Sequence, residues 1–313
     1  MTKPSLAVET LSICSGCEIA ILDLHLALAN VLDAIDLKYI QVLMDHREPP
    51  KEGVTVGFVS GGVRNEEHLE RLKMLRERCS VLVAFGACSA FGGIPGLANL
   101  HTKAEILEEV YINTKSTVNP KKIIPNRIVP PLLDELHPID DFVKVDYVLP
   151  GCPPPPKLIA ELVTCLLEGK EFKLEAKTVC DQCPLEKEEK AVTEFKRWGT
   201  AKIDPKRCLL EQGYQCLGPS TQSGCEARCP TALAGCRGCF GPTSNVEDQA
   251  AKMIGAIGSI VVQDPSKAPE AGQIVKEIPD LVGTYLRFTF AHSTFKKAVH
   301  TNAVKTKPVE AKT

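Results

Sequence analysis

Short apolar segments alternate with amphipathic segments through the first half of the chain. Five runs rich in β-branched and aliphatic residues predict buried strands over residues 6–13, 39–43, 54–59, 81–85 and 147–149. Between or after them, apolar residues at helical spacing predict helices over residues 19–32, 65–78 and 157–167. This alternation favours an α/β fold, with an open parallel sheet, helices on both faces and right-handed crossovers.

Two later regions break the alternation. Residues 92–138 contain one helical stretch, 103–111, and several prolines, so the segment is either an insertion wrapped over the surface or a partner, or a poorly ordered loop. From about residue 169 the strand signals vanish and Cys, Gly, Pro and charged residues dominate. A core of that composition would need bound inorganic groups to support it. A regular helix is predicted over 250–260, after capping-box spacing at 244–247.

Composition narrows the class of protein. The 313 residues carry 37 basic and 39 acidic side chains, a net charge of -2, and only 5% aromatics, which argues against a nucleic-acid partner. The N-terminal residues do not resemble a signal peptide, and no apolar stretch is long enough to cross a membrane. We therefore expect a cytoplasmic protein without a membrane anchor, in which cysteines serve as thiolate ligands rather than disulfides.

Twelve of the fourteen cysteines form three sets of four, each built around a Cys-x-x-Cys pair. The first set is scattered and consists of Cys14, Cys17, Cys88 and Cys152. Its members follow three different predicted strands, and the carboxyl ends of parallel strands meet at one edge of a sheet. We therefore expect all four thiols at that edge, in position to bind one cluster. The alternative is that these cysteines are small buried hydrophobic residues without a ligand.

The other two sets lie within sixty residues of one another. They consist of Cys180, Cys183, Cys208 and Cys216, and of Cys225, Cys229, Cys236 and Cys239. Four thiolates are the ligand count of a cubane iron–sulfur cluster, although structural zinc uses the same ligands and stays open as an alternative. The two remaining cysteines, Cys79 and Cys165, fall in helical patterns and are predicted to be packing residues.

Glu18 directly follows the first Cys-x-x-Cys pair. Buried beside a cluster it could relay protons, whereas exposed in the first turn of a helix it would only interact with the helix dipole. The histidines form no metal-spaced cluster, and the glycine-rich stretches lack a full phosphate-binding pattern.

Three motifs in this order resemble the small subunits of NiFe hydrogenases. They are Cys-Ser-Gly-Cys-Glu at 14–18, Gly-Ala-Cys-Ser-Ala-Phe-Gly-Gly-Ile-Pro at 86–95 and Gly-Cys-Pro-Pro at 151–154, and the resemblance covers residues 6–242. It implies a flavodoxin-like domain over 1–168 that carries the proximal cluster, and a mostly irregular iron–sulfur domain over 169–313. It also implies that the NiFe centre belongs to a separate large subunit, so no catalytic residue is expected in this chain.

The resemblance assigns three 4Fe-4S clusters. The first set would hold the proximal cluster, the set that begins at Cys180 the distal cluster, and the set that begins at Cys225 the medial cluster. Many family members have a histidine, as a ligand of the distal cluster, at the position of Cys180. Many also have a proline at the position of Cys229, and this proline leaves them a three-iron medial cluster. These departures look like the cytoplasmic methyl-viologen-reducing, coenzyme F420 non-reducing hydrogenases of methanogenic archaea, whose small (gamma) subunit matches best.

The function implied is electron transfer from H2 oxidation, through a small iron–sulfur subunit, to heterodisulfide reductase. Two related alternatives are the small subunit of the deazaflavin-reducing hydrogenase and the quinone-reductase subunit of respiratory complexes. The quinone-reductase subunit carries two adjacent cysteines and a single cluster. The spaced pair Cys14 and Cys17 and the eight further cysteines of this chain therefore argue against it. A zinc-stapled binding module without a redox role is the alternative from a different class.

Overall fold

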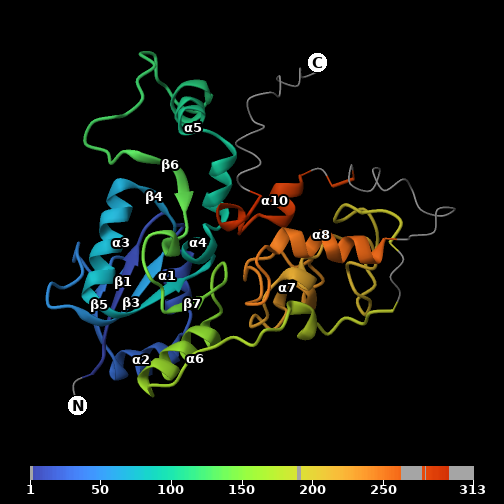
Figure 1. Cartoon of the computed structure of the whole chain (residues 1–313), viewed down its shortest axis with the longest axis horizontal. Helices are drawn as coiled ribbons and strands as arrows, with labels where there is room; N and C mark the ends of the chain where they lie inside the picture. Colours follow the sequence, from blue (N-terminus) through green and yellow to red (C-terminus); the bar gives the residue numbers. More distant parts are fainter. Residues whose placement is uncertain (1–2, 189–191, 262–276, 279, 296–313) are drawn as a thin grey trace.

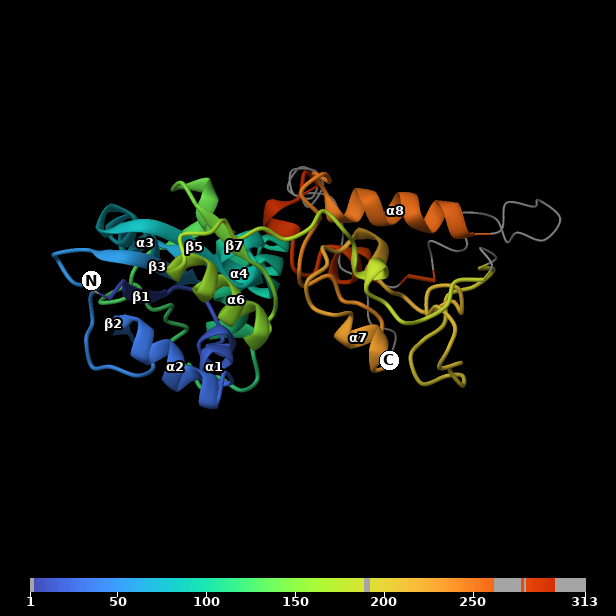
Figure 2. The same cartoon turned by 90° about the horizontal axis from the view of Figure 1, so that it is seen from below.

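The computed structural model describes residues 3–188, 192–261, 277–278 and 280–295. Two lobes lie side by side in Figures 1 and 2. The N-terminal lobe is built on a β-sheet, and the C-terminal lobe consists of loops and short helices gathered beside helix α8.

The sheet of the N-terminal lobe is parallel throughout. Its order is β2-β1-β3-β5-β7, with bounds Asp36–Ile40, Ser5–Thr10, Val54–Ser60, Cys79–Phe85 and Tyr147–Leu149. All five predicted strands are present, with shifts of a few residues at their ends. The order is that of flavodoxin-like folds, in which ligands bind at the carboxyl edge of the sheet.

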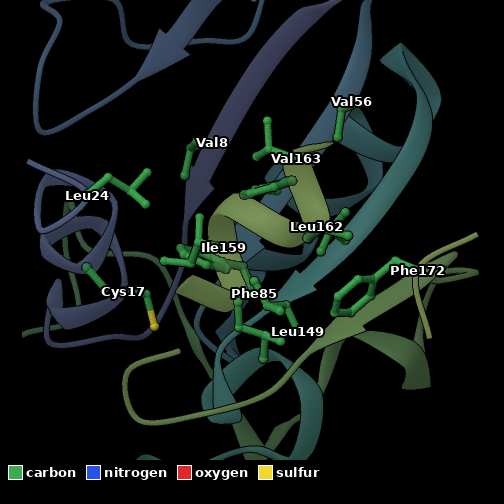
Figure 3. Packing of buried hydrophobic residues seen from close by; sticks show 14 of the residues in the cluster. Val8, Cys17, Leu24, Val56, Phe85, Leu149, Ile159, Leu162, Val163 and Phe172 are labelled. Atoms are coloured by element: carbon green, nitrogen blue, oxygen red, sulfur yellow. The ribbon is translucent and has the colours of Figure 1, made fainter. Parts of the chain in front are cut away.

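Helices cover both faces of this sheet. Helices α1 (Gly16–Leu22), α2 (Leu26–Ala34) and α6 (Pro156–Leu167) pack on one face, and α3 (Glu66–Arg78) packs on the other. Figure 3 shows the first of these cores, where Ile159, Leu162 and Val163 of α6 meet Phe85 and Leu149 of the strands. The Cys17 side chain packs in this core, although the residue lies at the carboxyl edge of the sheet.

Two helix predictions need correction. The single helix predicted over 19–32 is two helices, because the chain turns at His25, whose φ is +51°. The helix predicted over 250–260 is α8 (Gln249–Ile260), but its N-cap is Asp248, which accepts from the amides of Ala250 and Ala251, rather than a capping box at 244–247.

The segment predicted as an insertion has defined structure. After α4 (Ala87–Phe91) it contains a 3₁₀ helix, α5, a π-helix and β6, with bounds Ile94–Leu100, Lys103–Glu108, Glu109–Asn113 and Leu132–His137. Strand β6 pairs antiparallel with β4 (Val63–Asn65), a two-stranded sheet that the sequence pattern did not indicate. A short 3₁₀ helix in the N-terminal lobe spans Ile139–Asp141. Three more in the C-terminal lobe span Val179–Asp181, Gly218–Ser220 and Phe290–His292.

The C-terminal lobe has a core of its own, despite its polar composition. Besides α8 it contains α7 (Arg228–Thr231) and α10 (Leu281–Tyr285) and, within its described residues, only isolated β-bridges. Its core gathers around side chains such as Leu209, Tyr214, Met253, Tyr285 and Phe290. The domain boundary at 168 stays a prediction, and Phe172 and Phe240 from beyond it pack into the core of the N-terminal lobe.

The two lobes touch through named contacts. The Gly93 amide donates to the Phe288 carbonyl at 3.1 Å, the Phe91 ring meets the His292 ring edge-on with centroids 6.1 Å apart, and Lys157 of α6 pairs with Glu226. Of the helices in the part of the chain that the structure describes, none has the length and apolarity needed to cross a membrane.

Candidate functional site

The first cysteine set lies at the carboxyl edge of the sheet, as predicted. Cys14 and Cys17 follow β1, Cys88 lies in α4 directly after β5, and Cys152 follows β7. Backbone hydrogen bonds join the last two loops, since the Gly86 amide donates to the Leu149 carbonyl at 2.8 Å and the Ala87 amide to the Gly151 carbonyl at 2.7 Å. Segments 138 positions apart in sequence, Cys14 to Cys152, thus converge.

Glycines allow this convergence. A Cβ atom on Gly86 would lie 2.4 Å from the sulfur of Cys17, and one on Gly93 would lie 2.5 Å from the sulfur of Cys88. Both residues also have a positive φ, +91° and +59°, which disfavours any side chain. The backbone therefore approaches the thiols as closely as a glycine permits.

The electrostatics of the set follow from burial and proximity. Burial raises the pKa of the Cys17 thiol well above its usual range, and repulsion from Glu18, Cys88, Cys152 and Cys14 raises it further. Burial likewise raises the pKa of Cys88 to about 12, with contributions from Cys152 and Cys14. Each thiol therefore lies in the electrostatic range of the others, and a bound metal group would have to displace their protons.

The second set surrounds a cavity. Cys180, Cys183, Cys208 and Cys216 all line a space of about 170 Å³, whose other walls include Leu185, Leu209, Ala256 and Ile260. Burial raises the pKa of Cys180 to about 12, although the positive charge of Lys187, in the same wall, acts in the opposite direction. Burial also raises the pKa of Cys216, to about 11, while amide hydrogen bonds from Gly218 and Cys236 oppose the rise.

The third set lies between the other two. Cys236 is buried, Cys225 and Cys239 are partly buried and Cys229 is exposed. Burial raises the pKa of Cys239 to about 12, and repulsion from Cys225, Cys152 and Cys229 adds to it, while an amide hydrogen bond from Cys152 opposes it.

Two contacts give the order of the sets. Besides burial, the nearness of the Cys152 thiol in the first set raises the pKa of Cys239 in the third. The Cys236 amide of the third set donates to the sulfur of Cys216 in the second, at 3.3 Å. The spatial order is therefore the set of Cys14, then the set of Cys225, then the set of Cys180.

These observations bear on whether a cubane cluster fits. A four-thiol donor set, an apolar cavity lined by all four thiols and amides directed at the sulfurs suit an anionic iron–sulfur cluster. In the described part of the chain, no group of three or more His, Cys, Asp or Glu side chains is arranged to hold a metal ion. The thiols of each set are thus close enough to affect one another's pKa values, but they are not arranged around a single metal ion.

Glu18 is fully buried, which favours the first of the two interpretations of this residue. The Ser60 hydroxyl donates to its Oε1 atom, and its Oε2 atom has no hydrogen-bond partner among the described residues. The carboxyl group lies next to Cys17 and contributes to the raised pKa of that thiol.

Cys79 and Cys165 stand apart from the three sets. Cys79 begins β5 and packs in the core on the α3 face, and Cys165 lies in α6 against the opposite core. Both are packing residues, as predicted. Lys187, Thr221 and Gln249, which contact cysteines or their loops, were not predicted from sequence, because no local spacing marks them.

Comparison with known proteins shows which proteins share this fold. A family model described as NADH ubiquinone oxidoreductase, 20 Kd subunit, matches residues 14–166. A solved NAD+-reducing [NiFe]-hydrogenase in the H2-reduced state matches with a TM-score of 0.52 and 32% identity, over 55% of this chain and 96% of that one. A [NiFeSe]-hydrogenase structure from Dm. baculatum, 18% identical, shares the fold with a TM-score of 0.52 over 84% of this chain and all of that one. The fold is that of hydrogenase small subunits.

Sequence relatives define the family more narrowly. An F420-non-reducing hydrogenase subunit of the vhu type, from Methanocaldococcus jannaschii, is 46% identical over 88% of this chain and 91% of the relative. The corresponding F420-non-reducing hydrogenase subunit of Methanothermobacter marburgensis is 40% identical over the same shares. The relative from Archaeoglobus profundus, 34% identical over 91% of this chain and 95% of its own length, is called an iron-sulfur subunit of the F420-non-reducing hydrogenase. The chain belongs to this family of F420-non-reducing hydrogenase subunits.

Proposed function

We propose that this chain is the electron-transfer small subunit of a NiFe hydrogenase. The reaction, H2 to two protons and two electrons, would take place on a partner large subunit that holds the NiFe centre. Three 4Fe-4S clusters, when bound, would each accept and pass on one electron at a time. The observation that carries the proposal is the linear order of the three cysteine sets, with Cys152 close to Cys239 at one step and a hydrogen bond from the Cys236 amide to the Cys216 sulfur at the other.

The ligand assignment follows that order. Cys14, Cys17, Cys88 and Cys152 would hold the proximal cluster at the sheet edge. Cys225, Cys229, Cys236 and Cys239 would hold the medial cluster, and Cys180, Cys183, Cys208 and Cys216 the distal one. The position of the medial set between the other two supports this sequence of transfer.

The chain itself would contribute burial and hydrogen bonds. Glycine backbone packs closely against the sulfurs of Cys17 and Cys88 in the proximal set. The Cys236 amide donates to the Cys216 sulfur, and hydrogen bonds of this kind help to set reduction potentials.

The partners and compartment are proposed from the relatives. Their names describe hydrogenases that do not reduce F420, which favours that type over the deazaflavin-reducing alternative. We propose a large NiFe subunit at the proximal end and, at the distal end, a small iron–sulfur electron-transfer subunit leading to heterodisulfide reductase. We propose that the complex is cytoplasmic.

Glu18 is proposed as a proton relay beside the proximal cluster. Its complete burial, its hydrogen bond from Ser60 and its unpartnered Oε2 support that role, since a second polar group or water would complete a path.

One substitution tests the medial assignment. Cys229→Pro should convert a four-iron medial cluster to a three-iron cluster, because one thiolate is lost while three remain. The expected result is one iron fewer per complex and the paramagnetic signal of an oxidised three-iron cluster. Cys165→Ala is the matched control, since this cysteine lies in α6 outside the three sets, and it should keep the full iron content. An unchanged iron count in the Cys229 variant would contradict the assignment.

A further inference from the structure

The segment that joins α5 to β6 extends outside the hydrophobic cores of the protein. No residue from 103 to 131 is buried, and none of them belongs to the three cores found among the described residues. Figure 1 shows α5 and the loop that follows it, here called the arm (residues 114–131), projecting from the N-terminal lobe above β6. Short helices in proteins are stabilised mainly by packing of one apolar face, and residues 103–131 lack that packing.

Hydrogen bonds give the arm a defined shape. The side-chain nitrogen of Asn119 donates to the carbonyls of Tyr111 and Ile123, at 2.8 and 2.9 Å. The side-chain oxygen of Asn119 accepts from the Ile123 amide at 3.1 Å. The Thr117 hydroxyl donates to the Val110 carbonyl, also at 3.1 Å. The arm is therefore an ordered surface loop that is held by its own hydrogen bonds rather than by a core.

This ordered loop presents apolar side chains to solvent. Val118 is 95% exposed, Ile123 59%, Ile128 107% and Val129 49%. Ile128 also has a φ of +65°, a left-handed conformation that is strained for a β-branched residue. Large exposed apolar groups with polar residues around them mark interaction sites, so these side chains indicate a surface that is covered in the assembled protein.

The arm is also strongly basic. It carries Lys115, Lys121, Lys122 and Arg127 and no acidic residue, although the whole chain has a net charge of -2. All four of these side chains are exposed. Two copies of the arm would repel one another, so its charge argues against self-association through this loop. The charge instead favours a partner surface that combines apolar side chains with carboxylates.

The segment that bears the arm begins and ends at the carboxyl edge of the main sheet. It begins after α4, which contains Cys88, and it ends in β6, which pairs with β4 directly after β3. Two other exposed apolar residues lie at this edge, since Ile94 in the loop after Cys88 is 48% exposed and Ile19 in α1 is 53% exposed. The arm therefore rises from the same edge of the sheet as the first cysteine set.

We propose that the arm is a docking element for the large subunit, on which its apolar side chains fit a groove lined with carboxylates at the rim. The inference rests on the proposed function, because the large subunit is the partner that lies against the proximal set. An anionic membrane would match the same charges, but a membrane at this edge of the sheet would occupy the place of the large subunit.

Cross-linking of the native complex identifies the partner of the arm. A zero-length carbodiimide reagent joins an ammonium group to a carboxylate in contact with it, and mass spectrometry then identifies both chains. We expect Lys115, Lys121 and Lys122 to be linked to acidic residues of the large subunit. Links to a second copy of this chain or to another subunit, or no links from these lysines, would overturn the inference. Binding of the native complex to phosphatidylserine vesicles that is lost in Lys121→Glu with Lys122→Glu would overturn it as well.

Substitution measures what the arm contributes to the association. Val118→Ser with Ile128→Ser should raise the dissociation constant of the two subunits by about tenfold or more, because two apolar side chains lose their burial. The thermal unfolding midpoint of the free chain should stay the same, since neither residue belongs to a core. Leu167→Ser is the matched control, because Leu167 is also exposed but lies at the end of α6, near the start of β1 at the opposite edge of the sheet.

The outcomes separate the inference from the proposed function. An unchanged dissociation constant in the arm variant, or an equal loss of affinity in the Leu167 variant, would overturn the inference and leave the proposed function intact. A native chain that forms no complex with a NiFe large subunit would instead overturn the proposed function.

Discussion

At the scale of single residues, the cysteine sets depend on neighbours that have no side chain. Gly86 packs its backbone against the sulfur of Cys17, at a φ that only glycine adopts readily. Gly199 has a similar φ, +83°, but a Cβ atom there would meet nothing within 4 Å. A substitution at Gly199 would therefore show the effect of backbone strain alone, whereas one at Gly86 would add a clash with a thiol.

We predict that Gly86→Ala causes loss of the proximal cluster. The new Cβ atom would lie 2.4 Å from the Cys17 sulfur, so the thiol must move from its place in the set. Gly199→Ala should cost only about 1 kcal/mol of strain, because its Cβ atom points into open space. Iron analysis of the two purified complexes makes the comparison, and a full iron content in the Gly86 variant would refute the contact argument.

The chemistry-bearing cysteines could be predicted from sequence, because their residue type and spacing are local signals. Thr221 and Gln249 could not, since they are 28 positions apart and become partners only when α8 starts beside the third set. The burial of Glu18 likewise depends on Ser60, at the end of a different strand.

At the scale of elements, the apolar pattern predicted all five strands of the main sheet, because buried parallel strands are short apolar runs with few polar interruptions. Helix ends were less predictable. The apolar spacing of residues 19–32 continues across His25, but the backbone turns there and begins a second helix. The pairing of β4 with β6 was not foreseen because it joins segments far apart in sequence.

The first turn of α3 makes stability depend on pH. Burial lowers the pKa of His68 below its ordinary value of 6.5, Arg71 lowers it further, and Glu67 opposes the shift. The neutral ring accepts from the Arg64 amide through Nδ1 at 3.4 Å, which a protonated ring cannot do. Because the folded pKa is the lower one, the stabilisation is complete above pH 6.5 and is lost as the pH falls from there toward the folded pKa.

We therefore predict that His68→Gln flattens this pH dependence. The measurement is the thermal unfolding midpoint of the complex between about pH 5.5 and about pH 7.5, which spans the ordinary titration of histidine. His101→Gln, at an exposed position, serves as the control and should keep the native slope. Identical slopes in the His68 variant and the native complex would mean that this ring does not contribute.

At the scale of the whole molecule, helix α8 and the segment after α10 connect the three sets. The first residue of α8 reaches the loop of the third set, and Ala256, Ser259 and Ile260 farther along the helix line the cavity of the second. Phe288 then receives a hydrogen bond from Gly93, whose backbone packs on Cys88 of the first set. Helix α8 and Phe288 therefore lie against loops or walls of all three sets.

This arrangement is the part of the molecule that sequence alone could not supply. The family resemblance implied three clusters and named their ligands, whereas the proximity of Cys152 to Cys239 arises from the packing of the two lobes, and the contact from Cys236 to Cys216 arises from packing within the C-terminal lobe.

The central claim is that the three cysteine sets conduct electrons from H2. Mössbauer spectroscopy of the iron-57-labelled complex, before and after exposure to H2, tests this claim most directly. We predict three four-iron clusters assigned to this chain, with signals that change to those of reduced clusters when H2 is added. A chain that holds zinc at the second and third sets, or iron–sulfur signals that do not respond to H2 while the partner subunit is active, would contradict it.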